Sequence, residues 1–569
     1  MKILSIVFLA AVLLIGCSKE PENAADLVLI NGKIITVDES LPEAEAIAIK
    51  GDSIIAVGTN DEIEELVGEK TEVVDLKGAV AYPGFIESHA HFWGLGNAKL
   101  NLDLTQAKNW DEIIFQVASA AEKAQPGEWI LGRGWHQEKW DPVPEINVDG
   151  YPVHKILSEA SKYNPVMLTH ASGHAVFANA KAMELAGINN STPDPSGGKI
   201  VRDSLGNVIG VFEETAEELI AAKLREYLNS RTSEMIKEEN LKIIKLATEE
   251  SLSKGITSFQ DAGSTFKEID LLKELADKSE LGLRLYVMLG ESNENLNEKI
   301  NEYKMIGYGN NYLTVRAIKK YMDGALGSRG AWLLEPYADL LEHSGLNVTP
   351  INEIKETAQL AIENGFQLCT HAIGDRGNRE TLDLYENTFS KNTDKKDLRW
   401  RIEHAQHISN QDIPRFAKLG VIAAMQAVHC TSDAVFVPKR LGDERSKEGA
   451  YPWRKLIDSG AIICNGTDAP VEDVNPLASF YAAAARRLSN GTEFYPEQKM
   501  TRMEALKSYT INGAYAAFEE NIKGSLKKGK LADITVLSNN LLTCADEEIL
   551  NSKVLYTIVG GKIKYQFSN

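Results

Sequence analysis

The sequence is poor in cysteine, in positive charge and in long apolar runs. It has five cysteines in 569 residues and no CxxC pair, so a disulfide framework is not indicated. Its 61 Lys and Arg stand against 81 Asp and Glu, which gives a formal charge of -20. An acidic surface repels polyphosphates, and we therefore expect no nucleic acid partner.

The N-terminal apolar run is too short to span a bilayer comfortably. Lys2 precedes an apolar stretch over residues 3–15, and Leu14-Ile15-Gly16-Cys17 closes it. This pattern resembles a bacterial lipoprotein signal at residues 1–17, in which Cys17 carries the lipid. A plain secretory signal and a short membrane anchor are the alternatives. The expected location is the bacterial cell envelope outside the cytoplasm, with the protein lipid-anchored to the membrane, either facing the periplasm or at the outer membrane.

Short strands separated by turn signals occur near both ends of the chain. The first group is expected at 27–30, 33–37, 46–50, 53–58 and 72–75, and the second at 533–537, 554–559 and 562–566. Asn31-Gly32 and Gly51-Asp52 supply turns between strands of the first group. We expect residues 26–80 and 524–569 to form one discontinuous β-sandwich domain.

The central body, residues 81–523, alternates strands with amphipathic helical stretches. After the opening strand, further strands are expected at 256–260, 283–289, 315–322, 366–370, 400–403, 421–425 and 461–465. Eight strands are the count of a TIM (β/α)8 barrel, whose active sites lie at the carboxyl ends of the strands. A doubly wound sheet is disfavoured because no Gly-rich phosphate loop marks a single switch point. The expected fold class is therefore α/β, with a distorted TIM barrel as its main domain.

Residues 95–245 are too long for an ordinary connection after a barrel strand, and we call this segment the insert. Helices are expected in it around 213–228 and 233–253. Because the insert leaves the barrel just after His91, we expect it to lie over the barrel mouth as a substrate cap subdomain. Its Trp135 and Trp140 either favour an apolar or aromatic substrate or fill the core of the insert.

Residues of metal-ligand type stand at or near the ends of five expected strands. The opening strand is Pro83-Gly84-Phe85-Ile86-Glu87-Ser88-His89-Ala90-His91. His89 and His91 are spaced i, i+2 and face the same side, as a metal ion between two imidazoles requires. Later strand ends contribute Lys319, His371, His404 and Asp468. Each residue alone could be a buried hydrogen-bonded or turn-forming residue, but the ordered set favours a metal site.

Five motifs together resemble the amidohydrolase superfamily, and within it the branch of N-substituted formamide deformylases. They are the His-x-His strand, Lys319 followed by Asp323-Gly324-Ala325-Leu326-Gly327-Ser328-Arg329, Thr370-His371-Ala372-Ile373-Gly374-Asp375, Arg401-Ile402-Glu403-His404-Ala405-Gln406, and Gly466-Thr467-Asp468-Ala469-Pro470. The resemblance covers nearly the whole mature chain. It implies a metal-dependent hydrolase that cleaves a C–N bond of a linear amide or N-substituted formamide through a metal-activated hydroxide.

The resemblance also implies roles for the ligand residues. His89, His91 and Asp468 would hold one divalent ion, and His371 and His404 a second, for which Zn²⁺ is suited. Lys319, chosen over Lys320 because it stands four residues before Asp323, would join the two ions as a carbamate formed with CO2. In a one-metal site Lys319 would instead be an ordinary paired lysine. Asp468 would also be catalytic, taking the proton of water and passing it to the leaving nitrogen.

Substrate contacts are implied at three further positions. His174 lies in Ser172-Gly173-His174-Ala175, which matches a segment of this branch, and Asp323 lies in the motif after Lys319. Arg329 could bind a carboxylate or steer a carbonyl. For His174 and Arg329 a structural role is the alternative. The substrate is expected to be a small molecule, and a homodimer is left open. The alternative functions are hydrolysis of cyclic amides or esters and non-catalytic solute binding by a lipoprotein.

Overall fold

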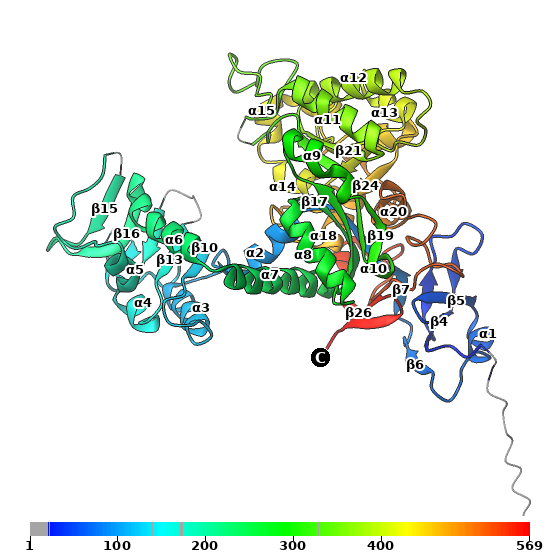
Figure 1. Ribbon diagram of the computed structural model, residues 1–569, viewed down its shortest axis with the longest axis horizontal. Coiled ribbons are helices and arrows are strands. Elements are labelled where there is room, and N and C mark those ends of the chain that lie inside the picture. The colour runs from blue at the N-terminus through cyan, green and yellow to red at the C-terminus, as the bar shows by residue number, and fades with distance from the viewer. Residues whose placement is uncertain are drawn as a thin grey trace, which may run out of the picture.

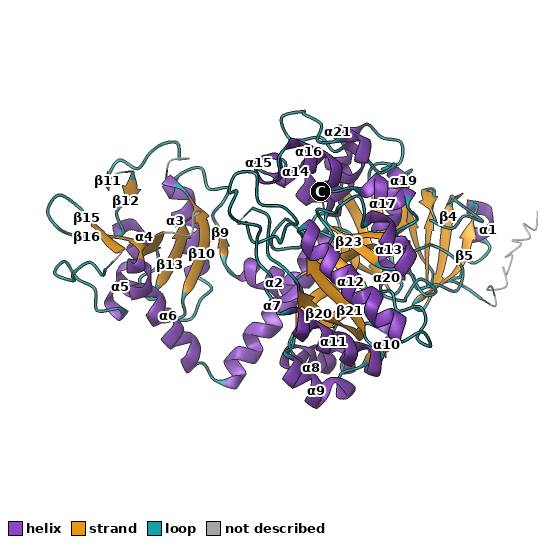
Figure 2. Cartoon of the chain, turned by 90° about the horizontal axis from the view of Figure 1, so that it is seen from above, coloured by secondary structure: helices purple, strands orange, loops and turns teal. Residues whose placement is uncertain are grey.

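The structure, a computed structural model, describes residues 21, 23–137, 140–148, 150–170, 175–196, 198–327 and 329–568. Cys17, with the rest of the expected signal, and His174 lie outside the described residues. Figures 1 and 2 show the insert at one end of the molecule, the barrel in the middle and the N-terminal strands at the other end. None of the helices in the described ranges combines the length and the apolar character that crossing a bilayer requires.

Eight parallel strands form the sheet of the barrel. In chain order they are β8 (Phe85–Ala90), β17 (Ile256–Ser264), β18 (Arg284–Leu289), β20 (Leu313–Tyr321), β21 (Gln367–Ala372), β22 (Arg401–His404), β23 (Ile422–Met425) and β24 (Ile463–Asn465). Each pairs in parallel with the next, and β19 (Met305–Gly307) pairs antiparallel with β20. All six residues of β8 are buried, as expected for a strand covered on both faces. The predicted α/β class and the eight-stranded parallel sheet are confirmed.

The segment that follows β24 lies against β8 and brings the sheet close to closure. The backbone N–H of Asp468 donates to the carbonyl of His89 over 2.8 Å. A Cβ added to Gly466 would lie 2.2 Å from Glu87 Oε1 and 2.6 Å from the His89 nitrogen, so the close approach requires glycine. The loop that carries Asp468 is therefore held directly beside the strand that carries the two histidines.

Helices follow the barrel strands along the chain. They are α8 (Phe266–Asp277), α9 (Asn293–Lys299), α10 (Tyr308–Asn311), α11 (Ile351–Asn364), α12 (Asp375–Lys391), α13 (Ile413–Leu419), α14 (Ala427–Asp433), α15 (Val437–Leu441), α16 (Asp443–Gly449), α17 (Trp453–Asp458), α18 (Pro476–Ala485), α19 (Arg502–Ser508) and α20 (Ile511–Ala516). In α8, Thr265 and Glu268 form a capping box that starts the helix. Its residues Ile269, Leu272 and Ala276 recur at helical spacing and are buried in the barrel core.

Strands from both ends of the chain form two sheets over one apolar core. The strand orders are β5-β4-β1-β6 and β27-β26-β25-β7-β2-β3. The bounds are β1 (Leu27–Ile30), β2 (Lys33–Ile35), β3 (Glu43–Ala44), β4 (Ala46–Lys50), β5 (Ser53–Gly58), β6 (Glu72–Asp75), β7 (Val80–Pro83), β25 (Ile534–Leu537), β26 (Val554–Val559) and β27 (Lys562–Gln566), with helices α1 (Asn60–Glu64) and α21 (Asp546–Leu550). Leu29 and Ile47 of the first sheet share a buried cluster with Ile34 and Ile534 of the second.

The insert contains a mixed six-stranded sheet of its own, ordered β15-β16-β14-β13-β10-β9. Its elements are β9 (Leu102–Asp103), α3 (Trp110–Ala121), β10 (Ile130–Trp135), β11 (Asn147–Val148), β12 (Tyr151–Pro152), α4 (Lys155–Ala160), β13 (Val166–His170), β14 (Ala175–Ala178), α5 (Ala180–Leu185), β15 (Gly198–Arg202), β16 (Val208–Glu214) and α6 (Glu218–Ser230). The helix expected around 213–228 begins later, because its first residues end strand β16. Trp135 and Trp140 lie in a buried cluster of the insert, which is a core position.

The insert joins the barrel through two helices that pack closely, α2 (Phe92–Leu100) and α7 (Ser233–Ser253). A Cβ on Gly96 of α2 would lie 2.2 Å from the Ile243 carbonyl oxygen of α7, so glycine permits this crossing. The fully buried residues of α7 begin at Ile243. In both views the first half of α7 leads toward the insert, whose sheet lies beside the barrel (Figures 1 and 2). Coverage of the mouth by the insert stays a prediction.

A buried ion pair connects the barrel to the terminal strands. Arg284 of β18 donates from Nε to Asp533 Oδ2 over 2.7 Å and from Nη2 to Oδ1 over 3.0 Å. The two side chains are 1% and 5% exposed. Burial disfavours the charge of Arg284, but the Asp533 carboxylate outweighs it and raises the pKa of the guanidinium.

We expect Asp533→Asn to lower the free energy of unfolding by about 3–5 kcal/mol, because it leaves the Arg284 charge buried without its partner. Chemical denaturation measures the change. The matched control is Asp546→Asn, which removes the partner of Arg502 at a site where the two side chains are 36% and 23% exposed. That change should cost about 0–1 kcal/mol. Equal losses in the two variants would contradict a special role for the buried pair.

Candidate metal centre

The predicted ligands come from the carboxyl ends of five barrel strands. His89 lies near the carboxyl end of β8, and His91 is the N-cap of α2. Lys319 lies in β20, His371 in β21 and His404 in β22. Asp468 lies in the loop after β24. The ring centroid of His404 lies 4.7 Å from that of His89 and 4.4 Å from that of His371. His89 Nε2 and His91 Nε2 lie 3.5 and 3.2 Å from Asp468 Oδ1. The structure thus brings residues distant in sequence to one place.

A buried carboxylate orients His89. Glu403 Oε2 accepts a hydrogen bond from His89 Nδ1, and Arg401 binds both oxygens of Glu403, from Nε over 2.7 Å and from Nη2 over 2.8 Å. All three side chains are fully buried. Burial raises the pKa of Glu403, but the Arg401 charge outweighs it and the pKa falls to about 2. Because ionised Glu403 accepts a hydrogen bond from Nδ1–H, the proton of His89 stays on Nδ1 and the lone pair of Nε2 is available on the side of Asp468.

The backbone at two of the ligand candidates lies in the left-handed region, with φ of 71° at His404 and 59° at Asp468. Such residues cost on the order of 1–3 kcal/mol each and cluster at functional sites. Glu87 holds the Asp468 loop in place. It accepts hydrogen bonds from the Thr467 nitrogen (2.9 Å), from Thr467 Oγ1 (3.0 Å) and from the His89 nitrogen (3.1 Å).

Protonation states in this centre suit a cation. Burial, followed by the nearby Lys319 ammonium, lowers the pKa of His371 to about 3. Burial also lowers the pKa of His404 far below its usual range. For Asp468 burial raises the pKa, but its contacts with His89 and His91 outweigh burial and hold the pKa well below the usual range. Neutral imidazoles and an ionised carboxylate are the forms that bind divalent metals.

Several polar atoms of this centre make no hydrogen bond within the part of the chain that the structure describes. They are His89 Nε2, Lys319 Nζ, His371 Nε2, His429 Nε2 and Asp468 Oδ1. Buried polar atoms are nearly always paired, so a group of them at one place indicates a ligand site. The ligand atoms of His89, His91 and Asp468 lie within 4.8 Å of one another. The residues fit a divalent cation, and imidazoles with a carboxylate are donors that suit zinc.

The structure separates the two neighbouring lysines of β20. Lys319 is 3% exposed, and its Nζ lies 4.7 Å from the centre of the Tyr321 ring. Lys320 donates to the carbonyl of Glu291 over 3.1 Å and lies 3.7 Å from Glu353 Oε1. Since successive strand residues face opposite sides, only Lys319 is on the side of the histidines.

The predicted substrate contacts have structural partners where they are described. Asp323 accepts three backbone hydrogen bonds, from Trp332 (2.8 Å), Gly374 (2.8 Å) and Ile373 (2.9 Å). Arg329 pairs with Asp339, from Nε over 3.2 Å and from Nη2 over 2.8 Å. Contact of either residue with a substrate stays a prediction, as it does for His174, which lies outside the described residues.

Three residues of the centre were not predicted from the sequence: Arg401, Glu403 and His429. Arg401 and Glu403 are spaced i, i+2 in the strand that ends at His404, and this spacing was a usable signal for a pair on one face. His429 stands four residues after the end of β23 at Met425. No residue of ligand type at the end of that seventh strand was predicted from the sequence motifs.

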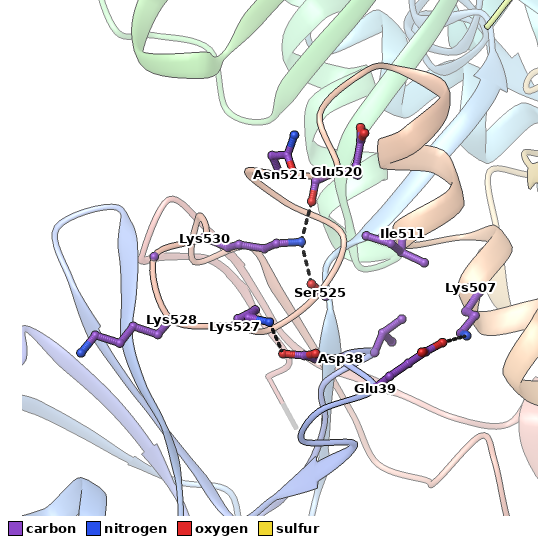
Figure 3. A pocket seen from close by; sticks show the side chains of 12 residues that line it. Asp38, Glu39, Lys507, Ile511, Glu520, Asn521, Ser525, Lys527, Lys528 and Lys530 are labelled. Carbon is purple, nitrogen blue, oxygen red and sulfur yellow. Dashed lines mark hydrogen bonds and ion pairs between the residues drawn. The ribbon is translucent and has the colours of Figure 1, made fainter. Parts of the chain in front are cut away.

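A surface hollow of about 660 Å³ lies elsewhere, between the N-terminal strands and the segment after α20 (Figure 3). None of the ligand candidates lines it. Three of its lysines have partners: Lys527 pairs with Asp38, Lys507 with Glu39, and Lys530 donates to Ser525 Oγ. The hollow contains none of the residues that the motifs predict as ligands, and two of its lysines are neutralised by carboxylates.

The family model described as "Amidohydrolase family" matches residues 72–565. The chain belongs to the amidohydrolase family. This amidohydrolase is 32% identical to Protein LONG AFTER FAR-RED 3 of Arabidopsis thaliana, over 95% of this chain and 92% of that one. It is 28% identical to N-substituted formamide deformylase of Arthrobacter pascens, over 95% and 98%. The predicted family is confirmed.

A solved structure of an uncharacterized metal-dependent hydrolase from Pyrococcus horikoshii OT3 is similar to this amidohydrolase. The TM-score is 0.70 at 27% sequence identity, and the match covers 92% of this chain and 99% of that one. The similarity is therefore not confined to the barrel, because coverage of 92% requires most of the insert to match as well.

We expect Glu403→Gln to lower zinc affinity by about 10–100-fold, because His89 loses the anionic acceptor that fixes its tautomer. Competition with a chromophoric chelator measures the dissociation constant. Asp412→Asn is the matched control, since Asp412 is 3% exposed and pairs with Arg379 without contact to the predicted ligands. If both variants bind zinc equally well, Glu403 does not position the ligand.

Proposed function

We propose that the protein is a metal-dependent hydrolase that cleaves the C–N bond of a linear amide or N-substituted formamide. The observation that carries the proposal is the meeting of His89, His91 and Asp468 at one point inside the barrel mouth, within 4.8 Å of one another. The family and the relative named N-substituted formamide deformylase support the choice of bond. At 28% identity that relative supports the reaction class better than the substrate.

In the proposed centre, His89, His91 and Asp468 hold one cation, and His371 and His404 stand beside it. When bound, a divalent cation such as Zn²⁺ supplies Lewis acidity that polarises a carbonyl and acidifies water. Asp468 receives the proton of the attacking water on a carboxylate oxygen and delivers it to the leaving nitrogen, so an acid and an amine are released. Carboxylation of Lys319 would replace its buried, unpaired ammonium group with an anionic carbamate that can bind a cation.

The organisation that we propose assigns residues 26–80 and 524–569 to a discontinuous β-sandwich and residues 81–523 to the barrel, with residues 95–245 as a cap. In both views α2 and α14 lie on the side of the barrel nearest the insert (Figures 1 and 2). These helices follow the carboxyl ends of β8 and β23, so the mouth opens toward the insert. This placement supports a role for the insert in substrate selection.

Hydrolysis of cyclic amides or esters, and solute binding without turnover, are the competing functions. A panel of N-substituted formamides, linear amides, cyclic amides and esters, offered to the zinc-loaded protein, separates them. Activity confined to the first two classes supports the proposal. Activity on the cyclic amides or esters alone would show that the protein is a hydrolase of that substrate class instead. Binding of panel members without turnover supports a solute-binding protein.

We expect Asp468→Asn to reduce kcat/KM by about 10²–10⁴-fold while the zinc-saturated variant keeps its metal and fold, because the amide retains an oxygen ligand but accepts no proton. Hydrolysis rates, elemental analysis and circular dichroism measure the three properties. Asp473→Asn is the control in the same loop, since Asp473 is 56% exposed and pairs with Lys254. Equal activity in the Asp468 variant and the control would show that Asp468 transfers no proton in the reaction.

We also propose that Cys17 anchors the protein by a lipid to a bacterial envelope membrane, outside the cytoplasm. The four-residue pattern that ends at Cys17 supports this location. When cells that express the full chain are extracted with Triton X-114, the wild-type protein should partition into the detergent phase. The Cys17→Ser variant should be found in the aqueous phase instead. An unchanged distribution would contradict lipidation at this residue.

A further inference from the structure

His429 is a buried histidine that neither the motifs nor the proposed reaction uses. It lies in α14, four residues beyond β23, and only 7% of it is exposed. Its Nε2 is buried and makes no hydrogen bond among the residues that the structure describes. Leaving a buried imidazole nitrogen unpaired costs about 1–3 kcal/mol, and a ligand outside the chain would offset that cost.

The position of His429 points to a cation as that partner. The ligand atoms of His404, His429 and Asp468 lie within 4.8 Å of one another, the same limit that holds for His89, His91 and Asp468. Two nitrogen or oxygen ligands on one tetrahedral zinc ion are roughly 3.4 Å apart, so small side-chain rotations suffice. Asp468 belongs to both groups, and its two oxygens can serve two ions.

The side chain of Gln426 fixes the tautomer of His404 in the form that can bind the same cation. Gln426, which immediately precedes α14, donates from Nε2 to the Ala424 carbonyl over 3.0 Å. Its amide orientation is thereby set, and its Oε1 accepts a hydrogen bond from His404 Nδ1 over 2.6 Å. His404 therefore carries its proton on Nδ1 and has the Nε2 lone pair available for a metal.

The rings of His404 and His429 are nearly parallel. Their planes differ by 12° and their centroids lie 6.2 Å apart, within the range of stacked aromatic pairs. Stacking involves the ring faces and leaves His429 Nε2 without a hydrogen bond among the described residues. A cation between the nitrogen atoms would account for the spacing and for the unpaired Nε2.

We propose that His429 is a ligand of a second divalent cation, which it holds together with His404 and with Asp468 shared from the first site. The inference rests on the proposed function, since it adds an ion to the same centre. It differs from the arrangement implied by the motifs, in which His371 and His404 hold the second ion and a carboxylated Lys319 joins the two ions. In the proposed arrangement α14, which follows the seventh strand, contributes the ligand His429.

The test is zinc content per chain, by elemental analysis after dialysis, together with stepwise affinities from chelator competition. We expect two ions in the wild type and one in His429→Ala, with the affinity of the retained ion unchanged. Cobalt-loaded protein gives a second readout, because His429→Ala should lose the visible absorption that belongs to one of the two ions.

His407→Ala is the matched control. His407 is 3% exposed, and both of its ring nitrogens lack a hydrogen bond among the described residues, yet it belongs to neither ligand group. This variant should keep both ions. If His429→Ala is poorly folded by circular dichroism, His429→Gln tests the same loss with a side chain of similar length.

Each outcome has a distinct meaning. Two ions in the His429 variants would overturn the assignment and leave the second ion to His371, His404 and Lys319. One ion in the wild type would also overturn it, while the metal-dependent hydrolase would stand on the first site. No ion in the wild type after refilling with zinc and bicarbonate would overturn the proposed function itself.

Discussion

The ion pair of Arg401 and Glu403 is the interaction on which the geometry of the centre depends. Both side chains are fully buried inside the barrel, where an isolated charge would be strongly disfavoured, so each is stable only with the other. Arg401 also donates to the Ser88 carbonyl over 2.6 Å, which links β22 to β8 across the barrel. The pair thus fixes the ring of His89 and the spacing of the two strands at once.

The backbone at the ends of the strands departs from regular geometry where ligands are needed. Glu403 and His404 are consecutive, yet both reach the centre, and a regular strand would direct them to opposite faces. The positive φ of His404 ends the alternation at that point. A similar backbone at Asp468 follows the close contact of Gly466 with β8. The strain is stored at the ligands and is supported by the rigid barrel beneath them.

Much of the fold could be predicted because the strands are short apolar or alternating runs bounded by turn residues. Strands β1, β4, β5, β6, β26 and β27 have the bounds that the sequence predicts. Ligand candidates at strand ends could likewise be found, since the carboxyl ends of parallel strands meet at one rim. The sequence pattern could not predict where side chains beyond the strand ends point. It did not show that Asp323 accepts hydrogen bonds from three backbone N–H groups, or that the His429 ring lies near Asp468.

The crossing of α2 and α7 at Gly96 has a consequence for how this protein diversifies. The chain leaves the barrel and returns to it at one place, and the sheet of the insert has its own buried clusters. The strand pairing of the barrel therefore does not depend on what lies between these two helices. Because the insert folds around its own core, its loops can change in length or composition without disturbing the strand order of the barrel.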